Sequence, residues 1–255
     1  MTLTSDLLKN VITNSTCNSD NLNSFIDSLQ EICGFQNETV LYDLKEYLAE
    51  EVYREIIRCR FYDAEAELSW LRERTRPYLA ENRVAHVAGC EAEAVRLARH
   101  YGEDAELAAE AAILHDITKN RNREEQLILC GEYGIICDEE QLKNASLLHA
   151  LTGAAFAKRH FGTSEAVCQA IRWHTTGKAD MSLLEKIIYL ADYIEPTRDF
   201  LGVEKLRKLA YEDLDEAIIL GLEMSLEELE RRGISAHPDS VQALNWYKNR
   251  RNERC

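Results

Sequence analysis

Helix-breaking residues and strand patterns are scarce in this sequence. Only 3 prolines and 11 glycines occur among its 255 residues, and no segment alternates apolar with polar residues as a half-buried strand does. Alanine, leucine and glutamate, which favour helices, are abundant instead. The hydrophobic fraction of 45% is sufficient for a buried core. We therefore expect an all-α protein.

Signals of several other protein classes are absent as well. The sequence has neither GxGxxG nor GxxxxGK[ST], so a glycine-rich nucleotide-binding loop is excluded as the source of its function. No apolar run approaches the ~18 to 20 residues of a membrane span, and we recognise no signal peptide. The 8 cysteines are scattered without a Cys-x-x-Cys pair, as expected of reduced thiols. We expect a cytoplasmic protein that does not associate with membranes.

Positive charge is in short supply. With 30 Lys and Arg against 45 Asp and Glu, the formal net charge is −15. A nucleic-acid-binding surface must be basic, so we expect no nucleic-acid partner. A small polyanionic molecule is compatible with an acidic surface if metal ions or a few local basic residues reverse the sign inside a cleft.

The first 70 residues differ in character from the rest. Residues 14–23 are rich in Asn and Ser, which compete with helix formation by bonding their own backbone. We interpret residues 1–70 as a helical N-terminal extension of unknown role and residues 71–255 as the functional domain. Periodicity and capping residues predict helices at about 64–80, 82–101, 105–118, 138 or 146 to 160, 164–173, 182 to just before 196, 204–231 with a possible break, and 238–250.

The dipeptide His115-Asp116 lies in the apolar, alanine-rich run 105–118, for which Asp104 is the expected N-cap. Burying a polar or charged side chain without a partner costs free energy. A divalent metal ion would satisfy both side chains. A histidine at a helix edge beside a solvated aspartate explains the dipeptide alone equally well, so its role depends on other residues.

Four more potential metal ligands stand among apolar neighbours: His86, His149, His174 and Asp192. Taken singly, each would more often be an ordinary core or surface residue. Taken with His115 and Asp116, in the order H…HD…H…H…D, they form a suitable ligand set for one or two ions. Asp116 is the natural bridge between two ions, because a carboxylate has two oxygens.

The other three histidines have simpler explanations. His100 and His160 each lie two residues before a glycine in the last turn of a predicted helix, where a histidine can bond free carbonyl groups. His237 precedes Pro238 in a polar loop, which predicts a surface position. We leave these three out of the site.

The motifs around the candidate ligands resemble those of a known family. The resemblance rests on Arg83-Val84-Ala85-His86, Leu114-His115-Asp116-Ile117-Thr118-Lys119, Leu148-His149 with Gly153, His174-Thr175-Thr176-Gly177 and Ala191-Asp192-Tyr193-Ile194-Glu195-Pro196-Thr197-Arg198. From about Leu71 to Tyr247, the chain is similar to the YqeK-type HD-domain proteins, which are bacterial symmetrical diadenosine tetraphosphate (Ap4A) hydrolases. The resemblance implies an HD-domain helical bundle around a di-metal site and cleavage of Ap4A into two ADP molecules.

The resemblance also implies which residues hold each ion. The first set is His86, His115, Asp116 and Asp192, and the second is His149, His174 and the bridging Asp116. The implied metal is iron, with manganese, cobalt or another divalent ion as alternatives.

Basic and hydroxyl-bearing residues near these motifs predict how phosphate groups bind. Lys119 can neutralise phosphate oxygens and Arg198 can clamp a phosphate, whereas Arg83 either does so or supports the site by pairing with an acid such as Glu195. We predict catalytic roles for Asp116, Lys119 and Arg198, and substrate-binding roles for Arg83, Lys119, Thr175, Thr176, Gly177 and Arg198.

Other functions are compatible with the same six metal ligands. A nucleotidase or a hydrolase of guanosine alarmones would differ in substrate, and a di-iron oxygenase would differ in chemistry. A non-catalytic HD module for binding or regulation could lose ligands freely, whereas all six are present here. A homodimer is one possible oligomeric state.

Overall fold

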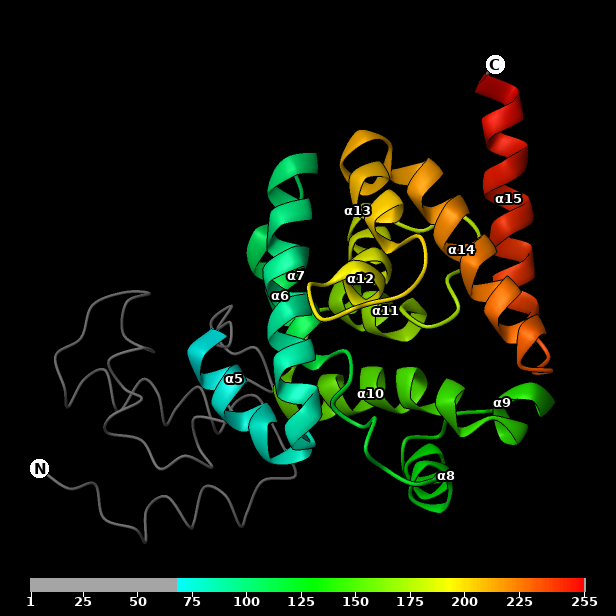
Figure 1. The fold of residues 1–255 in the computed structure, drawn as a ribbon. Helices are drawn as coiled ribbons and strands as arrows, with labels where there is room; N and C mark the ends of the chain where they lie inside the picture. Colours follow the sequence, from blue (N-terminus) through cyan, green and yellow to red (C-terminus); the bar gives the residue numbers. More distant parts are fainter. Residues whose placement is uncertain (1–67, 255) are drawn as a thin grey trace, which may run out of the picture. The chain divides into compact units, whose positions relative to one another are not determined.

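A computed structural model describes residues 68–254 of the chain (Figure 1). The predicted N-terminal extension, residues 1–70, therefore lies outside the described residues except for its last three. The elements are α5 (Leu68–Thr75), the 3-10 helix η2 (Arg76–Tyr78), α6 (Glu81–Tyr101), α7 (Ala105–Leu114), α8 (Arg123–Glu132), α9 (Glu139–Lys143), α10 (Ala145–Phe161), α11 (Glu165–Trp173), α12 (Leu183–Ile194), α13 (Val203–Glu212), α14 (Leu214–Arg231) and α15 (Pro238–Arg254). The described part contains no strand, so the all-α prediction is confirmed there.

Local capping signals predicted several helix ends correctly. The side chains of Asp104, Ser164 and Ser182 each accept a hydrogen bond from a backbone N–H of the helix that follows. Ser182 also forms the predicted capping box with Glu185. Gly102 ends α6 with a φ of 77°, a left-handed conformation that glycine adopts without strain.

The predicted helix 105–118 is four residues too long, because α7 ends at Leu114. Beyond that residue, the backbone N–H of Ile117 donates to the carbonyl of Leu114, and that of Lys119 donates to the carbonyl of Asp116. These bonds between residues three apart replace the α-helical pattern. His115 and Asp116 thus lie on a turn at the end of α7 and not within the helix.

Two further boundaries differ from the expectation. Neither Asp138 nor Ser146 starts the helix that carries His149: Asp138 caps the short helix α9, and α10 begins separately at residue 145. The possible break within 204–231 is real, since α13 and α14 meet at Asp213, whose side chain caps α14.

Four of the helices that carry the candidate ligands, or end at them, pack together. Helix α6 packs against α7 and α12, and α11 also lies against α7 and α12. Leu97, Ile113, Ile171 and Ile188 bring these four helices together and are at most 1% exposed. Helix α14 packs against α12, α13 and α15 (Figure 1). None of the helices in the described region has both the length and the apolar character that a membrane crossing requires.

Candidate metal centre

The structure brings the six predicted metal ligands together. They come from five helices or helix ends: His86 from α6, His115 and Asp116 from the end of α7, His149 from α10, His174 from the end of α11 and Asp192 from α12. The four histidines and Asp116 are at most 4% exposed, whereas the side chain of Asp192 is 21% exposed. The cluster is therefore buried except at the Asp192 edge.

Asp116 lies at the middle of the cluster. Its Oδ1 atom is 3.3 Å from His149 Nε2 and 3.8 Å from His174 Nε2. Its Oδ2 atom is 3.6 Å from the Nε2 atoms of both His86 and His115. The two oxygens of one carboxylate thus face two separate pairs of imidazoles.

Backbone carbonyls fix the ring orientation of three of these histidines. The Nδ1 atoms of His115, His149 and His174 each lie 2.6 Å from the carbonyl oxygen of the residue three positions earlier. A carbonyl oxygen can only accept, so each Nδ1 must carry the proton. In the neutral imidazole, Nε2 is then unprotonated and available to a metal.

His86 is held by a side chain that the sequence reasoning did not place in the site. Its Nδ1 atom lies 3.0 Å from Oε1 of Glu195, which is fully buried just after α12. A Cβ atom on Gly89 would come within 2.6 Å of Glu195 Oε2, so glycine leaves the space that this carboxylate occupies. For Arg83 the alternative to phosphate binding was a pair with an acid such as Glu195; in the structure Arg83 Nη2 pairs with Asp116 Oδ2, at 3.1 Å.

The Nε2 atoms face one another in two close pairs. The Nε2 atoms of His86 and His115 are 3.2 Å apart, and those of His149 and His174 are 3.0 Å apart. Two unprotonated nitrogens at this distance repel unless a cation lies between them. Oδ2 of Asp116 is buried and accepts no hydrogen bond, although it forms an ion pair with Arg83. The donor set and this oxygen fit divalent metal ions with imidazole and carboxylate ligands.

Neighbouring basic side chains and their hydrogen bonds keep both carboxylates ionised. Burial raises the pKa of Asp116, but the His115 and His149 imidazoles and the Lys119 ammonium outweigh it and hold the pKa well below its usual range. Burial also raises the pKa of Asp192, but the hydrogen bond from His86 outweighs burial, and the pKa of Asp192 lies well below its usual range. Both carboxylates are therefore charged at neutral pH, as metal ligands must be.

The pKa values of His174 and His149 are shifted in the opposite direction to that of His86. Burial lowers the pKa of His174 to about 3, and the neighbouring His149 and His115 act in the same direction. Burial also lowers the pKa of His149. Burial opposes the shift at His86, where hydrogen bonds to Asp192 and Glu195 raise the pKa. Protons therefore compete least with a metal ion for the Nε2 atoms of His149 and His174.

Three basic residues point their charged groups at the cluster. Arg83 pairs with Asp116 Oδ2, Arg198 Nη2 lies 2.5 Å from Asp192 Oδ1, and Lys119 Nζ lies 3.2 Å from His149 Nε2. The side chains of Arg83 and Arg198 are 22% and 32% exposed. These cations line the open edge of the site, where an anionic molecule would meet them.

The loop after α11 contributes one hydroxyl to the cluster. Thr175 Oγ1 lies 3.2 Å from His174 Nε2 and 3.4 Å from His149 Nε2, whereas the Thr176 hydroxyl donates to the Gly177 carbonyl. The backbone N–H of Gly177 donates to the carbonyl of Trp173, so it is not free to bind an anion. With a φ of 64°, Gly177 instead allows the chain to turn away from α11.

A buried hydrogen-bond network supports the turn that carries His115 and Asp116. The Thr118 hydroxyl lies 3.0 Å from the His149 carbonyl, to which it donates, and 2.9 Å from the Thr152 hydroxyl. Gln126 donates to the Thr118 carbonyl at 2.6 Å. Since every buried polar group here has a partner, the network ties the turn to α8 and α10.

The histidines left out of the site lie elsewhere in the structure. His100 bonds the backbone carbonyl of Tyr211 across 2.9 Å. His237 is only 5% exposed, so the predicted surface position is wrong. Its Nε2 atom lies 2.9 Å from Asp138, a partner 99 residues away that local sequence context does not reveal.

The comparison with protein families identifies the class. Residues 83–197 match the HD domain, and this range contains all six candidate ligands. A crystal structure of a predicted HD superfamily hydrolase involved in NAD metabolism, from Clostridium acetobutylicum, is 38% identical. It matches 73% of this chain and all of its own chain with a TM-score of 0.71. The fold and site are those of an HD-domain hydrolase.

Curated relatives narrow the class to one family. A protein of Halalkalibacterium halodurans is 43% identical over 171 residues, which are 67% of this chain and 91% of that protein. A protein of Bacillus subtilis is 38% identical over 172 residues, or 66% of this chain and 90% of that protein. Both are named symmetrical bis(5'-nucleosyl)-tetraphosphatase. The chain belongs to this family of HD-domain enzymes, and the predicted resemblance is confirmed.

Proposed function

We propose that this protein is a metal-dependent hydrolase that cleaves Ap4A symmetrically into two ADP molecules. The names of its relatives in Halalkalibacterium halodurans and Bacillus subtilis supply the reaction. The observation that carries the proposal is the pairing of four imidazole nitrogens on the two sides of Asp116. Such a ligand set has no evident use without metal ions.

The ligands divide between two ions in this proposal. His86, His115 and Asp192 would hold the first ion, His149 and His174 would hold the second, and Asp116 would contribute to both. We assign iron to both positions on the family resemblance, and imidazole and carboxylate donors are suited to it, as they are to manganese or cobalt. The ions would supply Lewis acidity and lower the pKa of a water molecule toward neutrality.

The basic residues at the open edge would bind the phosphate chain. Arg198, which pairs with Asp192, has a planar guanidinium suited to clamping a phosphate. Arg83 pairs with the other carboxylate, that of Asp116. Lys119 contacts His149 Nε2, so a cation bound to that nitrogen would release the ammonium for a phosphate oxygen. Thr175 would donate its hydroxyl to the same chain. We assign catalytic roles to Asp116, Lys119 and Arg198.

Symmetric cleavage sets a requirement on the site. Attack must fall on the second phosphorus from a nucleoside, so that each product carries two phosphates. The three cations around the cluster provide charge for a polyanion within a protein whose net charge is −15.

The test is one preparation of the full chain purified without oxygen. Metal content is measured by elemental analysis, and the protein is then incubated with Ap4A and the products are separated by chromatography. We expect near two equivalents of iron and ADP as the sole nucleotide product. ATP with AMP would overturn symmetric cleavage.

Mononucleotides and pyrophosphorylated guanosines serve as comparison substrates in the same assay. Turnover of these in preference to Ap4A would overturn the substrate assignment in favour of a nucleotidase or an alarmone hydrolase. A preparation that binds metal but turns over none of them would point to a regulatory module.

Three further assignments stay predictions. Residues 1–70 form an extension to the HD domain of residues 71–255, the protein acts in the cytoplasm, and it does not bind nucleic acid. A homodimer is compatible with the proposed reaction.

A further inference from the structure

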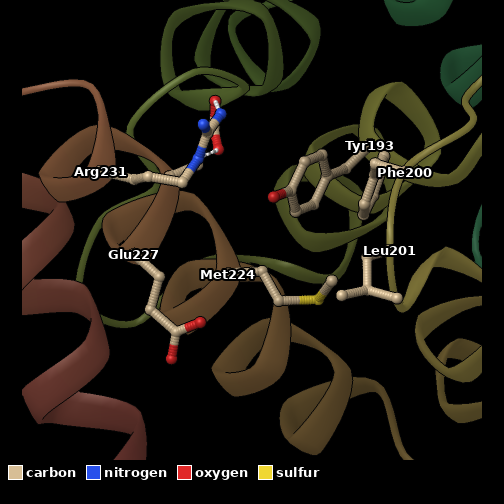
Figure 2. A pocket seen from close by; sticks show the side chains of 7 residues that line it. Tyr193, Phe200, Leu201, Met224, Glu227 and Arg231 are labelled. Atoms are coloured by element: carbon tan, nitrogen blue, oxygen red, sulfur yellow. Dashed lines mark hydrogen bonds and ion pairs between the residues drawn. The ribbon is translucent and has the colours of Figure 1, made fainter.

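A pocket lies beside the metal centre and is lined by none of its ligands. It has a volume of about 610 Å³ and opens between the end of α12, the loop that follows it and α14 (Figure 2). Tyr193 and Phe200 stand side by side in one wall, and Met224 extends from α14 toward Leu201 (Figure 2). The size and the aromatic lining are typical of a small-molecule site.

The aromatic wall offers a stacking surface. The rings of Tyr193 and Phe200 are themselves stacked, with centroids 5.0 Å apart and an angle of 23° between the planes. Leu201, next in the chain, is 99% exposed. A large apolar side chain held in water beside an aromatic pair is a feature that a flat, partly apolar ligand would cover.

Two residues of the pocket are neighbours in the chain of residues at the metal centre. Tyr193 follows Asp192 in the chain, and Phe200 comes two residues after Arg198, whose guanidinium pairs with Asp192. Successive Cα atoms are about 3.8 Å apart. A molecule with phosphate groups at Arg198 could therefore place an attached group in the pocket.

The charges in the pocket disfavour a phosphate and favour a neutral group. Arg231 is the cation among the described lining residues, and its Nη2 and Nε atoms donate to the Glu228 carboxylate, at 2.7 and 2.8 Å, which neutralises its charge. Glu227 adds a second carboxylate to the lining. A carboxylate repels phosphate but accepts a hydrogen bond from an exocyclic amino group of a nucleobase.

We propose that this pocket binds one nucleoside of the dinucleotide substrate, with the base stacked against Tyr193 and Phe200. This inference rests on the proposed function, and it names the part of the substrate that lies beyond the phosphates. The nucleoside diphosphate product would occupy the same pocket. Glu227 is the group that would accept from the base.

The test compares ligands that differ only by the nucleoside. In the Phe200→Ala and Leu201→Ser variants we expect the KM for Ap4A to rise about tenfold, the loss of one stacked base, with kcat and metal content unchanged. Inhibition by ADP should weaken by a similar factor, and inhibition by pyrophosphate should stay the same. Ile136→Ser is the matched control, because Ile136 is 94% exposed but does not line the pocket.

Unchanged ADP inhibition in the folded Leu201→Ser variant, or equal weakening for ADP and pyrophosphate, would overturn the pocket assignment. Failure of the proposed function gives a different result. The wild-type protein would then not cleave Ap4A, while Phe200-dependent binding of ADP would still support a nucleoside pocket.

Discussion

The two halves of the candidate metal centre differ in the groups that orient their histidine rings and in the direction of the histidine pKa shifts. We term the half formed by His86, His115 and Asp192 the charged half. There the Glu195 carboxylate orients His86, and hydrogen bonds to Asp192 and Glu195 raise the His86 pKa against the effect of burial. In the half formed by His149 and His174, the neutral half, backbone carbonyls orient both rings and burial lowers both pKa values.

In the metal-free protein, the imidazole Nε2 atoms of the two halves have different partners. A proton on His86 can be shared with Asp192, which lies 3.1 Å from its Nε2 atom. The neutral half has no such acid of its own and relies on Asp116 Oδ1 and on Lys119. In the proposed site, a metal ion would therefore replace a proton in one half and the Lys119 ammonium in the other.

The largest expected effect comes from removing the residue that both halves share. Asp116→Ala should lose both ions and reduce Ap4A cleavage at least about 1000-fold, because a metal supplies several kcal/mol of stabilisation. His86→Ala and His174→Ala should each lose about one ion. Metal-to-protein ratios and circular dichroism measure these outcomes. His100→Ala is the control, since His100 lies outside the site.

Equal metal loss in His86→Ala and His174→Ala, down to zero in both, would contradict the division into two halves. Retained hydrolysis in Asp116→Ala would contradict the assigned site altogether.

A smaller effect should follow from disturbing the carboxylate that orients His86. Glu195→Ala should weaken metal binding in the charged half by about 10- to 100-fold, and Glu195→Gln, which keeps an acceptor, should do so less. Gly89→Ala should act in the same direction, because its Cβ would lie 2.6 Å from Glu195 Oε2. Chelator competition measures the affinity, and excess metal should restore activity.

Gly131→Ala is the matched control for Gly89→Ala. Gly131 also lies within a helix, α8, but no atom lies within 4 Å of its added Cβ. The substitution should leave metal affinity unchanged and stabilise the helix by about 0.5 to 1 kcal/mol. If Gly89→Ala behaves like this control, Glu195 does not need the space that glycine leaves.

The last expected effect is a pH dependence of stability that differs in sign between His86 and the two histidines of the neutral half. His149 and His174 have lowered pKa values when folded, so as the pH falls below about 6.5 the unfolded chain takes up their protons first. The metal-free protein should then lose up to about 1.4 kcal/mol of stability per pH unit for each group, down to about pH 3 for His174. His86 has a raised pKa, so its contribution is present below 6.5 and is lost as the pH rises.

Urea unfolding of chelator-treated protein at several pH values measures this balance. Below pH 6.5, the His174→Gln variant should show a flatter loss of stability than the wild type. Above pH 6.5, the His86→Gln variant should lack the stability that His86 adds to the wild type as the pH falls toward 6.5. Identical slopes in both variants would show that the two halves do not titrate differently.

Local sequence signals correctly predicted helix starts that depend only on neighbouring residues. Asp104 and Ser182 were placed at helix starts because a capping side chain bonds the backbone two or three residues away. The end of α7 was missed because it depends on bonds between residues three apart around Leu114, which apolar periodicity does not distinguish from a continuing helix.

Contacts between residues far apart in the sequence limited how much of the site could be predicted. The order of histidines and aspartates predicted a cluster, and the structure brings those six residues together. The roles of Glu195 and His237 were not predicted, because their partners are His86 and Asp138, 109 and 99 residues away. Only packing of α6 against α12 reveals the first of these pairs.

The backbone carbonyls that orient His115, His149 and His174 bear on how this site tolerates mutation. Every residue type carries a carbonyl, so substitutions at Ala112, Ser146 or Ile171 that preserve the helix leave the acceptor in place. His86 alone depends on a side chain that a single codon change can remove. Genetic drift can therefore misorient one of the four imidazoles far more readily than the other three.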